Sequence, residues 1–322
     1  MANEDWHGKI GGPQRRALVV LGMHRSGTSA LAGSLAALGA GTPARLMRPA
    51  RFNPRGYWEP VAIVAVHDEI LSAIEIEWSS WRSVPAAWFR SDMAARYRAI
   101  LSDLVLSEYG ASPLFVVKDP RMCRLLPLWH RVFAGLGIAP AFLIALRHPL
   151  AVAASLERRE GIGTSRAVLV WMRHMLEAEA STRDRVRAFV SYEGVLADWR
   201  AELGEAGRRI KFDWPLDEDD RRAAVDAFLS ADLRHHAPPP FDDALQGILP
   251  HAATVYRLLN ALRAGDDSAA NRATLDAIRR ETDAWCRLFG NIGPEHEPAD
   301  GRKKAPPALD AEAPKSPPPT IP

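Results

Sequence analysis

The sequence predicts an α/β fold built on a parallel β-sheet with helices over both faces. Four short runs rich in apolar residues, 17–22, 113–118, 140–147 and 188–193, have the composition of buried strands. Helical stretches separate them, and strands that alternate with helices are typical of parallel sheets. After about residue 215 the pattern becomes all-helical.

The elements follow in order along the chain. ALVVLG (17–22) ends at glycine, and residues 28–38 carry apolar and small side chains in helical spacing, closed by Gly39. This order predicts a strand, a glycine loop and a helix. The runs at 113–118 and 140–147 each open with a proline, which a first strand position tolerates. Further helices are expected at 60–76, 92–109, 121–136, 149–160, 165–186, 217–231, 242–264 and 268–289.

We expect four parts in the chain: a flexible N-terminus (1–14), an α/β domain (15–240), a C-terminal helical extension (241–293) and a disordered tail (294–322). HAPPPF (236–241) is typical of a boundary. The tail is rich in proline, alanine and charge, so it buries too little apolar surface to offset its ordering entropy. The helical extension is interpreted as a cover on the sheet domain.

Composition narrows the class of protein. A formal net charge of +2 argues against a surface that coats nucleic acid. Cys123 and Cys286 lie too far apart in the chain for a disulfide framework or a zinc motif. The N-terminus lacks the apolar core of a signal peptide, and no run of about 18 apolar residues could span a membrane. We therefore expect a cytoplasmic protein without membrane insertion.

The loop after the first strand has the spacing of a phosphate-binding loop without its lysine. Gly22 and Gly27 are separated as in that motif, but Thr28 occupies the lysine position. The helix dipole, the hydroxyls of Thr28 and Ser29 and the guanidinium of Arg25 still suit a phosphate or sulfate. The alternative is a tight turn that binds nothing.

A second anion site is indicated at the end of the third strand. Arg147 ends the run PAFLIALR, and Ser155 lies eight positions later on the following helix. Ligands of open α/β sheets bind outside the carboxyl ends of the strands, so both side chains could contact a second phosphate. A surface ion pair of Arg147 is the alternative. Two such sites together indicate a nucleotide with phosphates at two positions.

These features resemble the P-loop-like sulfotransferases that use 3′-phosphoadenosine 5′-phosphosulfate (PAPS), and among them the bacterial proteins with an HRSGTS loop. The resemblance covers roughly residues 15–235 and implies a three-layer P-loop NTPase-like fold with additional C-terminal helices. It implies that the loop binds the 5′-phosphosulfate and that Arg147 and Ser155 bind the 3′-phosphate. Tyr192, in SYEGVLADW, matches a tyrosine near the adenine. The loop residues concerned are Arg25, Ser26, Gly27, Thr28 and Ser29.

Sulfuryl transfer needs in-line positioning, charge stabilisation on the leaving group and a base for the acceptor. Because the leaving phosphate is stabilised by cations, we expect Arg25 and Lys118 to serve this role without a metal. Lys118 could instead be a surface lysine. In GYWEP, Glu59 resembles a catalytic glutamate of several sulfotransferases, although it could simply complement a helix dipole. His67 is the reserve base, with a structural role as its alternative.

Two further sets of residues stay open at this stage. Arg121 could pair with Glu59 or contact substrate. Trp78, Trp81 and Trp88 could line a site for sugars or aryl groups, or could pack in the core. The sequence thus favours a PAPS-dependent sulfotransferase with a small-molecule or glycan acceptor. The alternatives are a P-loop kinase or NTPase with an atypical loop, and a non-catalytic nucleotide-binding module of the same fold.

Overall fold

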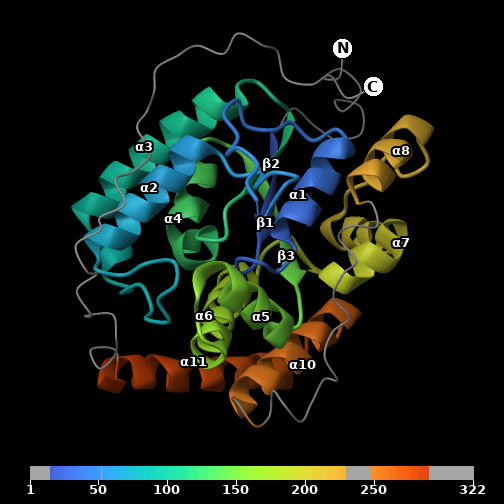
Figure 1. Cartoon of the computed structure of the whole chain (residues 1–322). Helices are drawn as coiled ribbons and strands as arrows, with labels where there is room; N and C mark the ends of the chain where they lie inside the picture. Colours follow the sequence, from blue (N-terminus) through green and yellow to red (C-terminus); the bar gives the residue numbers. More distant parts are fainter. Residues whose placement is uncertain (1–14, 52, 230–246, 248, 290–322) are drawn as a thin grey trace.

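A computed structural model describes residues 15–51, 53–229, 247 and 249–289 of the chain. A β-sheet lies at the centre of the described part (Figure 1), and it has four strands. All three strand pairings are parallel, in the order β2-β1-β3-β4. The strands span β1 Arg16–Leu21, β2 Leu114–Lys118, β3 Ala139–Leu146 and β4 Arg187–Ser191. The α/β class and the parallel sheet predicted from the sequence are confirmed.

Alternate residues of each strand enter two separate apolar cores. In β1, Ala17, Val19 and Leu21 belong to one core, whereas Leu18 and Val20 belong to the other. This follows from the two-residue period of a strand, and it explains why the strands read as continuous apolar runs. The sheet is therefore buried on both faces.

Helices cover both faces of the sheet (Figure 1). One face packs against α1 (Thr28–Ala37), α7 (Tyr192–Ile210) and α8 (Asp219–Phe228). The other face packs against a larger set. Its helices are α2 (Val61–Ala73), α3 (Asp92–Tyr109), α4 (Met122–Gly135), α5 (Pro149–Glu160) and α6 (Thr164–Thr182), with the short 3-10 helix η1 (Trp88–Arg90) beside α3.

The set of helices expected from the sequence lacked α7. The sequence interpretation placed Tyr192 in the fourth strand, but that strand ends at Ser191, whose hydroxyl accepts a hydrogen bond from the Gly194 amide and caps the helix. Val195 and Trp199 then begin a row of buried side chains at helical spacing. The cap and this spacing were both present in the sequence.

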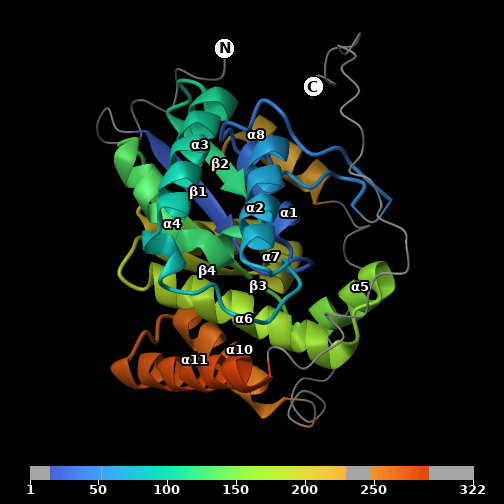
Figure 2. The same ribbon diagram turned by 90° about the vertical axis from the view of Figure 1, so that its left-hand side faces the viewer.

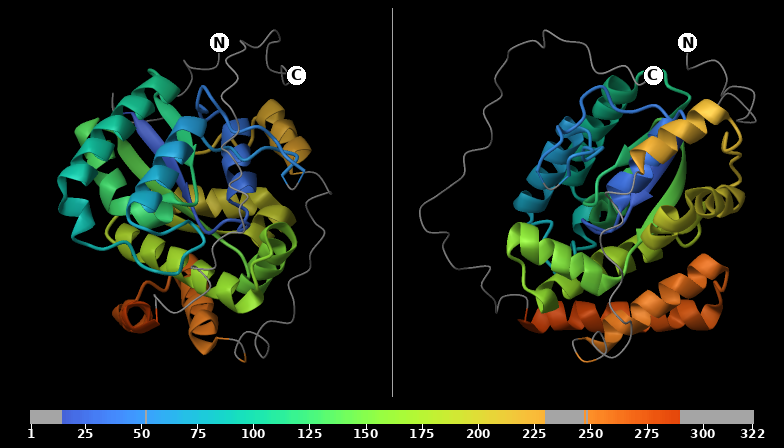
Figure 3. Two further views of the ribbon diagram at one scale, coloured as in Figure 1. Left: turned by 60° about the vertical axis from the view of Figure 1, so that its left-hand side comes forward. Right: turned by 45° about the vertical axis from the view of Figure 1, so that its right-hand side comes forward.

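The two C-terminal helices, α10 (Pro250–Ala264) and α11 (Ala269–Phe289), lie side by side against α6 (Figures 2 and 3). Apolar side chains of both helices join the larger core. The predicted cover over the sheet domain therefore exists. The boundary HAPPPF and the segments 1–14 and 294–322 lie outside the described residues, so the domain division stays a prediction.

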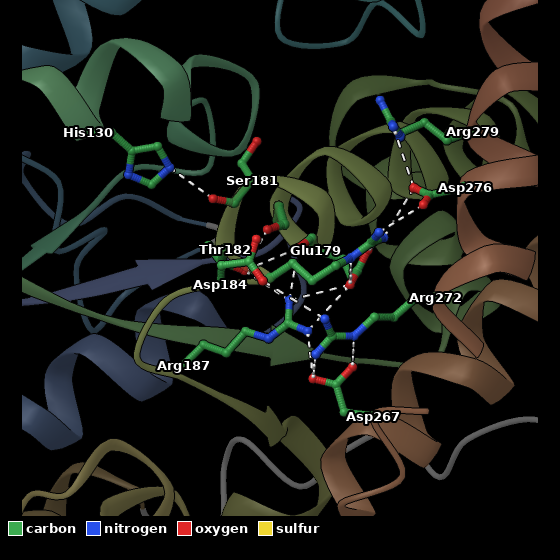
Figure 4. A network of polar contacts seen from close by, with 12 residues as sticks. His130, Glu179, Ser181, Thr182, Asp184, Arg187, Asp267, Arg272, Asp276 and Arg279 are labelled. Carbon is green, nitrogen blue, oxygen red and sulfur yellow. Dashed lines mark hydrogen bonds and ion pairs between the residues drawn. The ribbon is translucent and has the colours of Figure 1, made fainter. Parts of the chain in front are cut away.

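A buried carboxylate ties α11 to α6 and β4 (Figure 4). Glu179 on α6 is 2.6 Å from Arg183 and 3.4 Å from Arg187. Both arginines also reach the C-terminal segment: Arg183 lies 2.8 Å from Asp276 on α11, and Arg187 lies 3.3 Å from Asp267 in the turn between α10 and α11. Because both arginines are shared between carboxylates, the network fixes where α11 packs.

Within the described part of the chain, no helix combines the length and the apolar character needed to cross a bilayer.

Candidate active site

The glycine loop connects β1 to α1 through a backbone that only small residues fit easily. Gly22 and Gly27 have φ values of +134° and +85°, and a Cβ on Gly22 would lie 2.9 Å from the Ala145 carbonyl oxygen. Arg25 also has a positive φ, 68°, which is uncommon for a residue with a side chain. As in any α-helix, the first N–H groups of α1 have no partners inside the helix.

The hydroxyls of the loop have different surroundings. The Ser26 Oγ is buried and has no hydrogen-bond partner among the described residues. The Ser29 Oγ accepts hydrogen bonds from Lys118 at 3.3 Å and from Asn53 at 3.1 Å, and can donate to the Tyr57 carbonyl at 3.2 Å. A buried hydroxyl that directly precedes the N-terminus of a helix is suited to an oxyanion.

The second predicted anion site lies directly against the loop. The Arg25 Nε donates to the Ser155 Oγ at 2.8 Å, and the Arg147 Nη1 donates to the Arg25 carbonyl at 2.8 Å. Arg147 follows the last residue of β3, and Ser155 lies on α5. The folding of the chain thus places residues 130 positions apart within one hydrogen bond.

Tyr192 closes the same region from the start of α7. The Arg147 guanidinium lies 4.6 Å from the centroid of its ring, a cation–π distance. A Cβ on Gly27 would lie only 2.2 Å from the Tyr192 Cδ2. The glycine therefore allows the tyrosine ring to pack on the loop.

Most of these residues line one pocket. Of the sequence candidates, Arg25, Gly27, Thr28, Ser29, Arg147, Tyr192, Glu59 and Lys118 are on its wall. Ser26 and Ser155 are not among the described lining residues, although Ser155 accepts a hydrogen bond from Arg25. The wall also contains residues that the sequence analysis did not select, among them His24, Asn53, Arg55, Tyr57 and Arg159. Five lining side chains are cationic, whereas Glu59 is the single acidic residue among the described lining residues. The pocket therefore favours a ligand with several negative charges.

Lys118 and Glu59 form a buried ion pair on the pocket wall. The Lys118 Nζ is 2.5 Å from the Glu59 Oε1 and 2.9 Å from the Tyr57 carbonyl oxygen, and both charged side chains are almost fully buried. Burial raises the pKa of Glu59, while the Lys118 ammonium acts against that shift. Lys118 is therefore not a surface lysine.

His67 lies outside this pocket wall, in a buried chain of hydrogen bonds. Its Nε2 accepts from the Trp129 Nε1 at 2.9 Å, so Nδ1 carries the proton and donates to Asp119 at 2.7 Å. Because both ring nitrogens are engaged, the imidazole links α2 to the end of β2. We do not retain His67 as a base, and Glu59 remains the candidate.

Arg121 pairs with carboxylates of the protein. It lies 2.5 Å from Asp68 and 3.0 Å from Asp119, whereas the nearest Glu59 oxygen is 3.8 Å away. Burial alone would raise the pKa of Asp119, but the Arg121 guanidinium and the hydrogen bond from His67 hold it below its usual range. Of the two roles considered for Arg121, pairing is the one observed, mainly with Asp68 and Asp119.

The tryptophan cluster packs against the larger core. Trp78, Trp81 and Trp88 are partly buried there, and none is among the described residues that line the pocket. Trp78 reaches the site indirectly, because its ring centroid lies 4.4 Å from that of His24. The packing interpretation is favoured over a stacking wall. Across the described residues, no group of three or more His, Cys, Asp or Glu side chains is arranged to hold a metal ion.

Comparisons with known proteins give similarity in structure alone. No protein-family model matches the chain, and no curated protein matches it in sequence. Among solved structures, the chain is similar to the sulfotransferase domain of an olefin synthase from Synechococcus PCC 7002, with 18% identity, 77% of this chain and 97% of that chain covered, and a TM-score of 0.44. A sulfotransferase from Mycobacterium avium is 14% identical, with 82% of this chain and 80% of that chain covered and a TM-score of 0.42. A sulfotransferase from Mycobacterium tuberculosis H37Rv is 17% identical, with 70% of this chain and 75% of that chain covered and a TM-score of 0.38. All three are similarities in structure at low sequence identity.

Proposed function

We propose that the protein is a PAPS-dependent sulfotransferase that transfers a sulfuryl group to a hydroxyl or amine of a carbohydrate or small metabolite. The observation that carries the proposal is the contact between Arg25 and Ser155 at 2.8 Å in one pocket region. The glycine loop and the Arg147/Ser155 pair are thereby close enough for one nucleotide to contact both. A nucleotide with phosphates at two positions would satisfy both sites.

The fit of the donor is supported by charge and by unpartnered groups. Among the described lining residues, five carry a cationic side chain and one is acidic, and that residue is already paired with Lys118. Phosphate groups carry up to two negative charges each near neutral pH, so a bisphosphate nucleotide would balance this excess. Ser26 and the first N–H groups of α1 would bind the 5′-phosphosulfate, and Arg147 and Ser155 would bind the 3′-phosphate, with Tyr192 near the adenine.

The proposed chemistry uses the Glu59–Lys118 pair. Glu59 would accept the proton of the acceptor hydroxyl while the oxygen of that hydroxyl forms the new S–O bond. The S–O bond to the nucleotide 5′-phosphate breaks, and the electron pair leaves with that phosphate. Arg25 and Lys118 would stabilise the negative charge that accumulates there, so the proposal requires no metal.

A P-loop kinase or NTPase is the first alternative, and the carboxylates disfavour it. Such an enzyme holds magnesium with a carboxylate near the loop. Asp119 follows β2, but its two oxygens accept hydrogen bonds from Arg121 and His67. Glu59 is paired with Lys118. A non-catalytic module of the same fold would keep both anion sites, so only a transfer assay separates it from an enzyme.

The test is a transfer assay with PAPS labelled in its sulfuryl group and a panel of hydroxyl and amine acceptors. We expect label in an acceptor together with release of adenosine 3′,5′-bisphosphate. Glu59→Gln should lower the rate by about a hundredfold or more, with unchanged affinity for the bisphosphate. Glu157→Gln, on the exposed side of α5, is the matched control and should retain the rate. Tight binding of the bisphosphate without transfer to any acceptor would favour the non-catalytic module.

A further inference from the structure

Arg159 stands near the end of α5, four residues after Ser155 and hence on the same face of the helix. It lines the pocket, and its side chain is about one-quarter exposed. The proposal above gives it no role. The contacts of its guanidinium can therefore indicate which part of the ligand Arg159 would bind.

The Arg159 guanidinium faces positive charge inside the pocket. After burial itself, Arg159 is the largest influence that lowers the pKa of Arg25, ahead of Arg147. Outside the pocket wall, its Nε lies 2.9 Å from the Glu160 carboxylate at the exposed end of the helix. Two guanidinium groups that repel each other across a pocket are stabilised when an anion lies between them.

The contact with Tyr57 indicates which end of the ligand Arg159 would reach. The guanidinium lies 5.3 Å from the Tyr57 ring centroid. The carbonyl of Tyr57 in turn accepts hydrogen bonds from the Lys118 ammonium and the Ser29 hydroxyl. Arg159 is thus connected to the residues proposed for the 5′-phosphosulfate, whereas Arg147 stacks on Tyr192.

We propose that Arg159 is a further binding residue for the donor nucleotide, contacting the oxygens at its 5′ end together with Arg25. This inference rests on the proposed function, because it assumes that the pocket takes a nucleotide. A guanidinium also matches the geometry of phosphate and sulfate oxygens through paired N–H donors. The 53–59 loop and α5 would then close on the nucleotide from two sides.

Calorimetry with three nucleotides tests the inference on the full chain: adenosine 3′,5′-bisphosphate, adenosine 5′-phosphate and adenosine 3′-phosphate. Arg159→Ala should weaken the first two by about tenfold to a hundredfold, the effect of a lost hydrogen bond to a charged group. The affinity for adenosine 3′-phosphate should not change. Arg158→Ala is the matched control, because that neighbouring side chain is exposed and donates to the Ala154 carbonyl of its own helix.

The possible outcomes separate the inference from the proposed function. Unchanged affinity of Arg159→Ala for all three nucleotides, or a loss confined to those with a 3′-phosphate, would overturn the role of Arg159 and leave the sulfotransferase proposal in place. An equal loss in Arg158→Ala would also overturn it, because the effect would then be one of general charge. Failure of the unaltered protein to bind any of the three would contradict both proposals.

Discussion

Gly27→Ala perturbs the loop and Tyr192 at once, and the structure gives the expected size of the stability loss. The new Cβ would lie 2.2 Å from the Tyr192 Cδ2 and 2.8 Å from its Cγ, so the ring must move. Overpacking of this kind typically costs about 1–3 kcal/mol. The positive φ of 85° adds about 1–2 kcal/mol for any residue with a Cβ. We expect a free energy of unfolding lower by the sum, together with at least tenfold weaker binding of adenosine 3′,5′-bisphosphate.

Gly137→Ala separates the two contributions. Gly137 has a φ of 63°, but no other described residue would lie within 4 Å of a Cβ there, and it precedes β3 at the end of the sheet opposite the loop. It should show the backbone cost alone in urea denaturation and retain the bisphosphate affinity in calorimetry. Bisphosphate binding by Gly27→Ala as tight as by the unaltered protein would refute the reasoning that Tyr192 and the loop form one binding surface.

Arg147→Ala should weaken adenosine 3′,5′-bisphosphate by about tenfold to a hundredfold and adenosine 5′-phosphate much less, and equal weakening in calorimetry would mean that the 3′-phosphate site is misplaced. Because burial raises the pKa of Glu59 and a base must be deprotonated, kcat should fall with decreasing pH with a midpoint above 4.5, and a limb at or below that value would argue against Glu59. Burial lowers the pKa of His174 from 6.5 to about 3, so stability should be full above pH 6.5 and fall towards pH 3 by about 1.4 kcal/mol per pH unit. His174→Asn should show a shallower fall in urea denaturation between pH 6.5 and 5, and an unchanged slope would contradict this account.

The sheet could be predicted because each strand is buried on both faces and therefore reads as an apolar run. The interpretation of 113–118 as a strand and of 92–109 as a helix agrees closely with β2 and α3. It missed α7, because the polar residues after Ser191 were assigned to the strand rather than to a capped helix. The pattern of apolar residues thus located most strands and helices, but the start of α7 depended on the hydrogen bond of the Ser191 side chain.

The candidate site was predictable where a residue lies at the carboxyl end of a strand. Lys118 is the last residue of β2 and Arg147 directly follows β3, and parallel strands end on the same side of the sheet. The pairing of Glu59 with Lys118 could not be derived, because it depends on the path of the 53–59 loop over α1. His67 illustrates the converse: its spacing on a helix gave no sign that Trp129 and Asp119 occupy both ring nitrogens.

The most direct test of the central claim compares two nucleotides in calorimetry. One is adenosine 3′,5′-bisphosphate, and the other is ATP with magnesium. The account predicts tighter binding of the bisphosphate, because Arg147 and Ser155 supply a site for a 3′-phosphate that ATP lacks. Tighter binding of ATP with magnesium would contradict the claim that the loop and the Arg147/Ser155 pair hold one doubly phosphorylated adenosine.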